Sequence, residues 1–273
     1  MPVTQHDKAV QFRALHAQPR AFIIANAWDA GSAQLLAGLG FPAIATSSAA
    51  SAATLGRSDG KITRDEAMAH ARLLAGAVDA PVAGDLENGF GHDPEHAAET
   101  IRLAAQTGMV GGSIEDHTGE PGKPIYDFNQ AVERVAAAVA AARSLSFPFT
   151  LTARCEKFLH GQADLDETIE RLQAFEKAGA DVLFAPGLPD LKSVQLVCAS
   201  LSKPVNFMVG IPGHSFSVAE LQDAGVRRIS LATSLHRAAM SGLYRAAMEI
   251  QDGGTFEFLN GLVSPKELGR FLR

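Results

Sequence analysis

Hydrophobic positions along the chain fall into short apolar runs that alternate with longer segments rich in Ala and Leu. Within the short runs, polar and apolar residues do not alternate, which is typical of strands buried on both faces of a parallel sheet. The pattern predicts eight such strands, at residues 22–27, 43–46, 82–87, 112–115, 149–155, 182–185, 205–210 and 229–232.

The segments between the strands are long enough for helices, as at residues 64–78, 94–107, 129–145 and 165–178. A glycine ends several of these helical segments shortly before the next strand, because glycine readily takes the left-handed conformation that closes a helix. A proline stands just before three of the strands, where a helix must already have ended. The glycines are Gly40, Gly108, Gly179 and Gly225, and the prolines are Pro81, Pro148 and Pro204.

Repeated strand–helix units favour an α/β fold, and eight of them favour a closed (β/α)₈ barrel of the TIM type, spanning about residues 20–250. The alternative is an open, Rossmann-like sheet, but no Gly-x-Gly-x-x-Gly follows the first strand. An extra N-terminal helix, Gln5–Ala17, and a C-terminal helical tail at about 255–273 complete the chain. We expect a single domain over residues 1–273.

Composition indicates which partners and which cellular compartment to expect. The chain has 273 residues, a net charge of −6 and no basic run, so we expect no nucleic-acid partner. No apolar stretch approaches the ~20 residues of a membrane span. The first residues lack the basic and apolar regions of a signal peptide, and Cys155 and Cys198 show no paired spacing. We therefore expect a cytoplasmic protein with reduced thiols and no membrane partner.

Polar residues gather where the predicted strands end. In a parallel barrel the carboxyl ends of all strands meet at one face, and this face carries the chemistry. The polar residues expected there are Asn26, Trp28 and Asp29; Thr46, Ser47 and Ser48, with Arg57 and Asp59 in the following loop; Asp85 and Glu87; Glu115, Asp116 and His117; Arg154 and Glu156; and Asn206.

The carboxylates among them predict a metal site. Period-2 alternation places Asp85 and Glu87 on one face of their strand, with apolar Leu86 on the other. Together with Glu115 they would repel one another in a partly dry cleft unless a cation neutralised them. Hard oxygen ligands without a cysteine pair or His-rich spacing suit Mg²⁺, or Mn²⁺, rather than Zn²⁺.

Other ionisable residues have simpler interpretations. Asp29 fits a helix N-cap as well as a site residue, and Asp93 before Pro94 reads as an N-cap alone. The remaining candidates are interpreted as caps or solvated loop residues (Asp127, Asp164 and Asp166), as structural or surface histidines (His70, His96 and His236) and as a packing thiol (Cys155).

Six motifs, in order between about residues 20 and 250, resemble the isocitrate lyase / phosphoenolpyruvate mutase superfamily. They are Asn26-Ala27-Trp28-Asp29-Ala30, Thr46-Ser47-Ser48-Ala49, Leu55-Gly56-Arg57-Ser58-Asp59, Asp85-Leu86-Glu87-Asn88-Gly89-Phe90-Gly91, Ile114-Glu115-Asp116 and Ala153-Arg154-Cys155-Glu156.

The resemblance implies an enzyme that acts on a 2-oxo or 2-hydroxy acid through an enolpyruvate-like intermediate. It makes Asp85 the direct Mg²⁺ ligand, with Asp59, Glu87 and Glu115 holding the ion through water. The expected site then has three groups: catalytic residues Asp59, Glu115, Arg154 and His117; substrate-binding residues Trp28, Ser47, Ser48, the Ala49 backbone N–H, Arg154 and Asn206; and metal-binding residues Asp85, Glu87 and Glu115.

The chain also departs from the family pattern. The loop from His117 to Tyr126 has no cysteine, whereas the lyases of the family carry one there that handles the proton, so an isocitrate or methylisocitrate lyase is disfavoured. Glu87 replaces the usual aspartate, Ser48 replaces a common glycine, and the strand ending at Phe184 lacks the histidine of the phosphonopyruvate-processing branch.

The leading hypothesis is a Mg²⁺-dependent lyase or hydrolase that acts on a C–C bond of a small carboxylic acid, with His117, Thr118 or Tyr126 supplying the acid–base group. The alternatives are a phosphonomutase or another P–C bond enzyme, and a non-catalytic barrel that binds 2-oxo acids. A class II aldolase would need a His-rich metal set, which the sequence lacks. The resemblance further implies a homo-oligomer, a dimer or tetramer with a swapped C-terminal helix.

Overall fold

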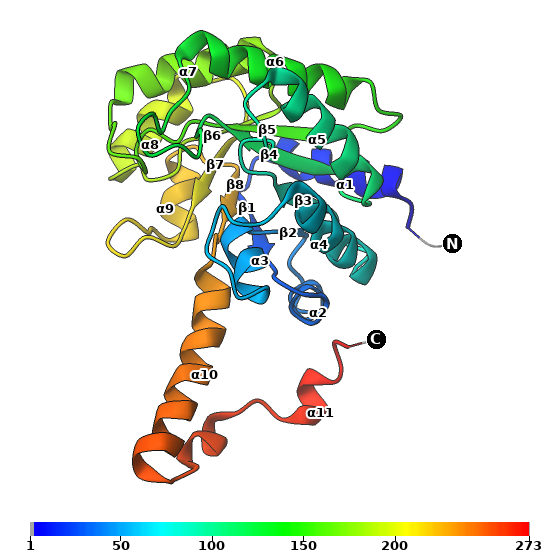
Figure 1. Cartoon of the computed structure of the whole chain (residues 1–273), viewed down its shortest axis with the longest axis vertical. Coiled ribbons are helices and arrows are strands. Elements are labelled where there is room, and N and C mark those ends of the chain that lie inside the picture. The colour runs from blue at the N-terminus through cyan, green and yellow to red at the C-terminus, as the bar shows by residue number, and fades with distance from the viewer. Residues whose placement is uncertain (1–2, 273) are drawn as a thin grey trace.

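Eight parallel strands close into a barrel in the order β1 to β8, and the last strand pairs with the first (Figure 1). The computed structural model describes residues 3–272. The strands are β1 Phe22–Asn26, β2 Ala43–Ala45, β3 Val82–Asp85, β4 Gly111–Glu115, β5 Thr150–Arg154, β6 Val182–Phe184, β7 Val205–Met208 and β8 Arg228–Ser230.

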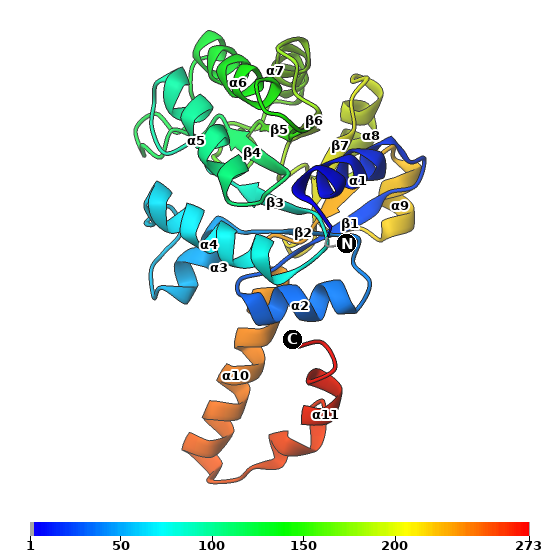
Figure 2. The same cartoon turned by 90° about the vertical axis from the view of Figure 1, so that its right-hand side faces the viewer.

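Helices follow the strands and cover the outside of the barrel (Figures 1 and 2). Buried alanines on their inner faces, such as Ala97, Ala104 and Ala138, let them pack closely on the strands. The helices are α1 Gln5–Ala17, α2 Ala30–Gly38, α3 Ser48–Thr54, α4 Arg64–Ala77, α5 Pro94–Gln106, α6 Phe128–Arg143, α7 Leu165–Lys177, α8 Leu191–Ala199, α9 Val218–Asp223, α10 Ser234–Gly253, the 3₁₀ helix η1 Glu257–Gly261 and α11 Pro265–Leu268.

The predicted barrel and N-terminal helix are therefore confirmed, with three differences of detail. Strand β3 ends at Asp85, because Glu87 takes a left-handed backbone with φ 48°. The segment after Ser47, expected as a loop, forms the short helix α3, which the Ser47 hydroxyl caps by accepting from the Ala50 N–H. The C-terminal tail holds only η1 and α11, two short helices, with Arg273 outside the described residues.

Helix α1 closes the N-terminal end of the barrel. Its residues Ala9, Phe12 and Leu15 are buried against the first layer of side chains inside the barrel, which includes Phe22 and Ile24. The ring of His16 packs edge-on against both Phe12 and Phe22. The interior is thus sealed at this end, and the cavity inside the barrel opens toward the carboxyl ends of the strands.

Helix α10 leaves the barrel as an arm (Figures 1 and 2). None of its residues is buried, and a stripe of large apolar side chains lies on it. The chain then turns back, and the Phe271 ring packs close to Gly38 of α2. Among residues 3–272, no helix is both long and apolar enough to cross a membrane.

Candidate active site

Three neighbouring strands bring the predicted acidic residues together. Asp85 ends β3 in register with Ser113 of β4, and Glu115 ends β4 in register with Arg154 of β5. Successive residues of a strand point to opposite faces, so these side chains share the interior face of the barrel. The carboxyl ends of β3, β4 and β5 therefore form one polar cluster, as the sequence predicts.

Arg154 lies at the centre of this cluster. Its Nη1 is 2.9 Å from Asp85 Oδ1, its Nη2 is 3.3 Å from Glu115 Oε2, and its Nε is 2.8 Å from Glu156 Oε1. Burial acts against the charged guanidinium, but the three carboxylates outweigh burial and raise the Arg154 pKa. The sequence predicts a clamp for a substrate carboxylate at this position. In this structure the guanidinium holds the protein's own acids in place.

Glu156 lies at the strand-end face that the sequence predicts, and the structure gives it a role that the sequence does not assign. Its side chain is almost fully buried, and burial raises its pKa despite the Arg154 contact. Behind it, the backbone N–H of Glu156 donates to Asp116 Oδ1 over 2.7 Å, and Arg171 pairs with Asp116 at 3.3 Å. This buried chain of contacts fixes the backbone that carries Arg154.

Glu87 is the least satisfied of the acids. Its Oε1 is buried and accepts no hydrogen bond from any residue between 3 and 272. Burial, followed by the charges of Asp85 and Glu115, raises its pKa to about 8. A left-handed backbone at a non-glycine residue costs of the order of 1 kcal/mol. A half-buried acid with one buried oxygen that lacks a partner, held in a strained conformation, is a sign that a cation belongs next to it.

The donor set suits Mg²⁺ held partly through water. Within residues 3–272, no three His, Cys, Asp or Glu side chains form a ready-made metal cage. Mg²⁺ does not require one, because it keeps several waters and touches one or two carboxylates directly. Asp85, Glu87 and Glu115 supply hard oxygen donors, and Glu87 Oε1 is free to accept.

The end of β2 completes the wall of the site. The Ser48 N–H donates to Asp85 Oδ2 over 3.1 Å, and the Thr46 hydroxyl accepts from the Asp85 N–H over 2.8 Å. The Ser48 hydroxyl also bonds to Asp59, whose pKa is raised by burial and by the charge of Asp85. The N-terminus of α3, with Ser47 and the Ala49 N–H, thus lies beside the carboxylates.

Two other predicted substrate-binding residues, Trp28 and Asn206, contact neighbouring side chains or backbone. Trp28 packs edge-on against His236 with ring centres 5.3 Å apart, and its carbonyl contacts His70. Asn206 is buried, donates to Ser230 Oγ and accepts from Arg228 Nε. Asn206 still lines the cavity inside the barrel, whereas Trp28 lies outside it.

The structure also tests the residues that the sequence interprets as helix caps or packing residues. Asp29 caps α2 by accepting from the Ser32 N–H, and Asp164 caps α7 in the same manner. Asp93 and Asp127 occupy the N-cap positions of α5 and α6, which confirms the interpretation of Asp93 and fits that of Asp127, although neither side chain makes a cap hydrogen bond. Cys155 is fully buried, which confirms that it is a packing residue.

The loop after β4 carries one accessible candidate for proton transfer. The ring of His117 stacks on His160 with centres 3.9 Å apart, and His117 Nδ1 is 3.5 Å from Glu115 Oε1. Thr118 and Tyr126 are buried, and both hydroxyls are engaged within the loop region. Thr118 also borders the outer hollow, but its hydroxyl donates to the Lys123 carbonyl, so His117 is the best placed of the three to transfer a proton. Nothing in the sequence pointed to His160, because its loop meets that of His117 only in the folded barrel.

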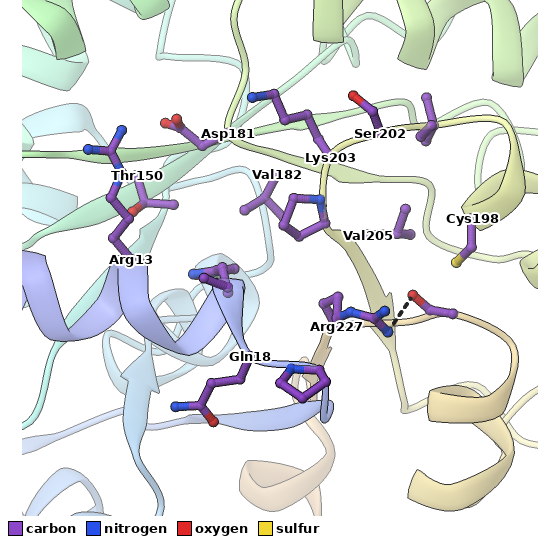
Figure 3. Close-up of a pocket in the computed structure, with 16 residues that line it drawn as sticks. Arg13, Gln18, Thr150, Asp181, Val182, Cys198, Ser202, Lys203, Val205 and Arg227 are labelled. Carbon is purple, nitrogen blue, oxygen red and sulfur yellow. Dashed lines mark hydrogen bonds between the residues drawn. The ribbon is translucent and has the colours of Figure 1, made fainter.

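Two hollows meet at the carboxylates. A cavity of about 250 Å³ lies inside the barrel and is lined by Ser47, Asp85, Arg154, Asn206 and Arg228 among others. An outer hollow of about 770 Å³ is bordered by Asp59, Glu87, Glu115 and His117. A different hollow, of about 620 Å³, lies at the opposite end of the barrel beside Arg13, Lys203 and Arg227 (Figure 3). Since it holds none of the strand-end acids, we place the active site at the first two.

Comparison with known proteins agrees with this geometry. The family model for phosphoenolpyruvate phosphomutase matches residues 12–251. The chain belongs to this family. Its members share the isocitrate lyase / phosphoenolpyruvate mutase superfamily that the sequence motifs predict, and its curated relatives include lyases.

Individual relatives are similar over most of their length. A crystal structure from Burkholderia cenocepacia J2315, assigned only by inference as a lyase/mutase, is 51% identical with a TM-score of 0.96, covering 98% of this chain and 96% of that one. The oxaloacetate decarboxylase of Rhodopseudomonas palustris HaA2 is 28% identical over 91% of this chain and 86% of the relative. A phosphonopyruvate hydrolase solved with oxalate and Mg²⁺ has a TM-score of 0.85, with 97% and 94% coverage. At 22% identity this last likeness concerns the fold alone.

Proposed function

We propose that this protein is a Mg²⁺-dependent enzyme that breaks a C–C bond of a small 2-oxo or 2-hydroxy carboxylic acid through an enolpyruvate-like intermediate. The observation that carries the proposal is the buried, partnerless Glu87 Oε1 beside Asp85 and Glu115. That arrangement calls for a cation at a place where a small acid fits in a cavity of about 250 Å³. The similarity to an oxaloacetate decarboxylase supports the same reaction class.

Asp85 would hold the ion directly, with Asp59, Glu87 and Glu115 acting through water. When bound, Mg²⁺ supplies a Lewis acid that polarises the carbonyl and stabilises negative charge on its oxygen. The N-terminus of α3 offers backbone N–H groups and the Ser47 hydroxyl to a carboxylate, as helix N-termini commonly do.

Arg154 orients the reacting centre. It fixes Asp85 and Glu115 relative to each other through an ion pair with each. A bidentate guanidinium also suits the planar oxygens of a substrate carboxylate. His117, at the border of the outer hollow, is placed to give or take a proton as the bond breaks.

Substitution of Asp85 tests this function. We expect Asp85→Ala to abolish Mg²⁺-dependent formation of a 2-oxo product from a panel of 2-oxo and 2-hydroxy acids, while the circular dichroism spectrum stays that of the folded barrel. Asp127→Ala, at the exposed start of α6, is the matched control and should keep its activity. Unchanged turnover by Asp85→Ala would refute the proposal. Retained acid binding without any product under Mg²⁺ or Mn²⁺ would identify a binding protein instead.

A P–C bond reaction is the second candidate. The observation that favours it is a second cationic side chain, Arg228, in the inner cavity beside Arg154, since two guanidinium groups also suit a phosphonate. Phosphorus NMR of the enzyme with phosphoenolpyruvate and Mg²⁺ separates the two reactions. A new phosphonate resonance would assign a phosphonomutase, and an unchanged spectrum would remove this candidate.

The exposed arm supports a homo-oligomer, which we also propose. One face of α10 carries four large apolar side chains at helical spacing, each more than a third exposed: Met240, Leu243, Tyr244 and Met248. An apolar stripe of this size in water is typical of an interaction surface. We infer that α10 packs on a second copy of the chain, giving a dimer or a dimer of dimers.

A further inference from the structure

Arg228, the first residue of β8, is a buried cation inside the barrel. Only 6% of its surface is exposed. Its Nε donates to Asn206 Oδ1 over 2.8 Å and its Nη2 donates to Thr152 Oγ1 over 3.0 Å, while its Nη1 lies 3.4 Å from His16 Nε2. The amide and the hydroxyl are neutral. Burial and the nearby Arg228 charge lower the His16 pKa to about 3, so the imidazole is neutral as well.

No carboxylate balances this charge. Within residues 3–272 Arg228 forms no salt bridge with an Asp or Glu, and the charge that shifts its pKa, that of Arg154, has the same sign. Burial, and then Arg154, lower the Arg228 pKa to about 9, so the side chain is still a cation near neutral pH. A buried ion without a partner is strongly unfavourable, and proteins retain one where a ligand of opposite charge completes it.

Arg228 lies one layer below the active site. Thr152, which accepts a hydrogen bond from Arg228, lies on the same face of β5 as Arg154 of the carboxylate cluster. The two residues are two positions apart, which corresponds to about 7 Å along a strand. Both arginines line the inner cavity of about 250 Å³. The cavity therefore has one guanidinium at the level of the carboxylate cluster and a second at its floor.

Small side chains keep the space between the two layers open. Ala45, Ala83 and Ser113 of β2, β3 and β4 line the same cavity, at positions where larger residues would fill a barrel of this size. Each terminal nitrogen of a guanidinium carries two hydrogens. Arg228 thus has an N–H on Nη1 and on Nη2 beyond those that the Thr152 and His16 contacts use.

We propose that Arg228 binds a second carboxylate of the substrate at the floor of the inner cavity, and thereby selects short dicarboxylic acids over monocarboxylic acids of the same length. The inference rests on the proposed function, which places the first carboxylate at the top of the cavity. The second carboxylate supplies the counter-charge that Asn206 and Thr152 cannot. Binding then replaces the water of a small anion with charge-assisted hydrogen bonds in a dry site.

The arginine next to it in the sequence offers a matched control. Arg227 lies outside the barrel interior, on the hollow at the opposite end, where it contacts the Gly225 carbonyl (Figure 3). Its charge is partly exposed to solvent and needs no ligand. Removing Arg227 tests the effect of losing a positive charge from this region without altering the inner cavity.

Calorimetric titration with succinate and butyrate, in the presence of Mg²⁺, tests the proposal. The two acids differ by one terminal carboxylate in place of a methyl group. We expect the wild-type protein to bind succinate at least about tenfold more tightly than butyrate, a value typical of one charge-assisted contact. Arg228→Met should lower succinate affinity by about the same factor and leave butyrate affinity unchanged, whereas Arg227→Met should change neither.

Asn206→Asp provides a second variant that does not depend on removing the arginine. It places a carboxylate where the amide oxygen now lies 2.8 Å from Arg228 Nε, so the protein supplies its own counter-charge. We expect a folded protein with a raised Tm and with succinate affinity at least about tenfold lower. This variant decides the matter if Arg228→Met does not fold.

Each other outcome counts against the proposal. Equal affinity for succinate and butyrate in the wild-type protein, or an unchanged succinate preference in Asn206→Asp or in folded Arg228→Met, would overturn the role of Arg228 alone. Failure of the wild-type protein to bind oxalate, succinate or butyrate with Mg²⁺ would overturn the proposed function, and this inference with it.

Discussion

Glu87 and Asp85 share one strand end, but only Asp85 has a partner there. Asp85 Oδ1 is 2.9 Å from Arg154 Nη1, whereas the buried Oε1 of Glu87 accepts no hydrogen bond within residues 3–272. Arg154 therefore forms an ion pair with Asp85 but not with Glu87. With a pKa of about 8 the Glu87 carboxyl holds a proton near neutral pH, and a bound cation would favour its ionised form.

Glu87→Gln should stabilise the metal-free protein. Folding forces the Glu87 carboxyl to take up a proton near neutral pH, whereas the amide is already neutral and can donate a hydrogen bond to a neighbouring carboxylate. We therefore expect a gain of about 1 kcal/mol, or a Tm higher by a few degrees. The same change should reduce the further rise in Tm that Mg²⁺ produces. Differential scanning calorimetry with EDTA and then with Mg²⁺ measures both effects. Glu133→Gln, on the exposed face of α6, is the control, and a Glu87→Gln variant with unchanged Tm and Mg²⁺ response would contradict the interpretation.

His117→Gln should lower kcat by roughly a hundredfold or more, the usual contribution of a general acid–base residue, with little change in KM. His160→Gln should have a smaller effect, because its ring contacts His117 without bordering the outer hollow. Steady-state kinetics on the substrate found in the acid panel measures the difference. Equal losses in the two variants would argue that the stacked pair is needed only for the shape of the loops.

His16 predicts a pH dependence of stability. Burial and the charge of Arg228 lower its native pKa to about 3, from 6.5 in the unfolded chain. Between these values the unfolded chain binds a proton that the native protein does not, so this residue makes stability fall as pH falls from about 6.5 toward 3. The slope it contributes is of the order of 1 kcal/mol per pH unit.

His16→Gln should flatten this part of the curve, because glutamine does not titrate. Urea unfolding at several pH values between 4 and 7 measures the slope. His6→Gln, on the same helix but exposed, should leave the slope as it is in the wild-type protein. The arginine that faces His16 from β8 keeps its charge throughout this range, so it does not add a slope of its own. An equal slope in wild type and His16→Gln would show that His16 is not held neutral.

Leu243→Glu should weaken the assembly. It places a charge in the middle of the apolar stripe of α10, at a residue that is 61% exposed in the single chain. We expect light scattering after size exclusion to show a smaller species than the wild-type protein gives at the same concentration. Arg245→Glu changes the charge on the same helix outside the stripe and should keep the wild-type mass. A monomeric wild-type protein would contradict the proposed homo-oligomer.

Local sequence patterns specify the barrel. Short apolar runs bounded by glycine and proline specify buried parallel strands, because each run must pack on both faces and each helix must end before the next strand begins. The same pattern located Asp85, Glu115 and Arg154 at strand ends, since parallel strands bring their carboxyl ends to one face. The pattern also predicts that Glu87 lies at this strand end, although the strand alternation on which that prediction depends stops at Asp85.

The partners of these groups follow from long-range contacts in the folded barrel. Arg154 binds Asp85, Glu115 and Glu156 at once, and Arg228 meets His16 from a helix at the other end of the chain. No local pattern shows these contacts, because barrel closure brings together residues that are distant in sequence. The strength of a buried charge depends on what surrounds it in space. The sequence therefore showed which chemical groups are available, and the closed barrel determined which of them lack a partner within the protein.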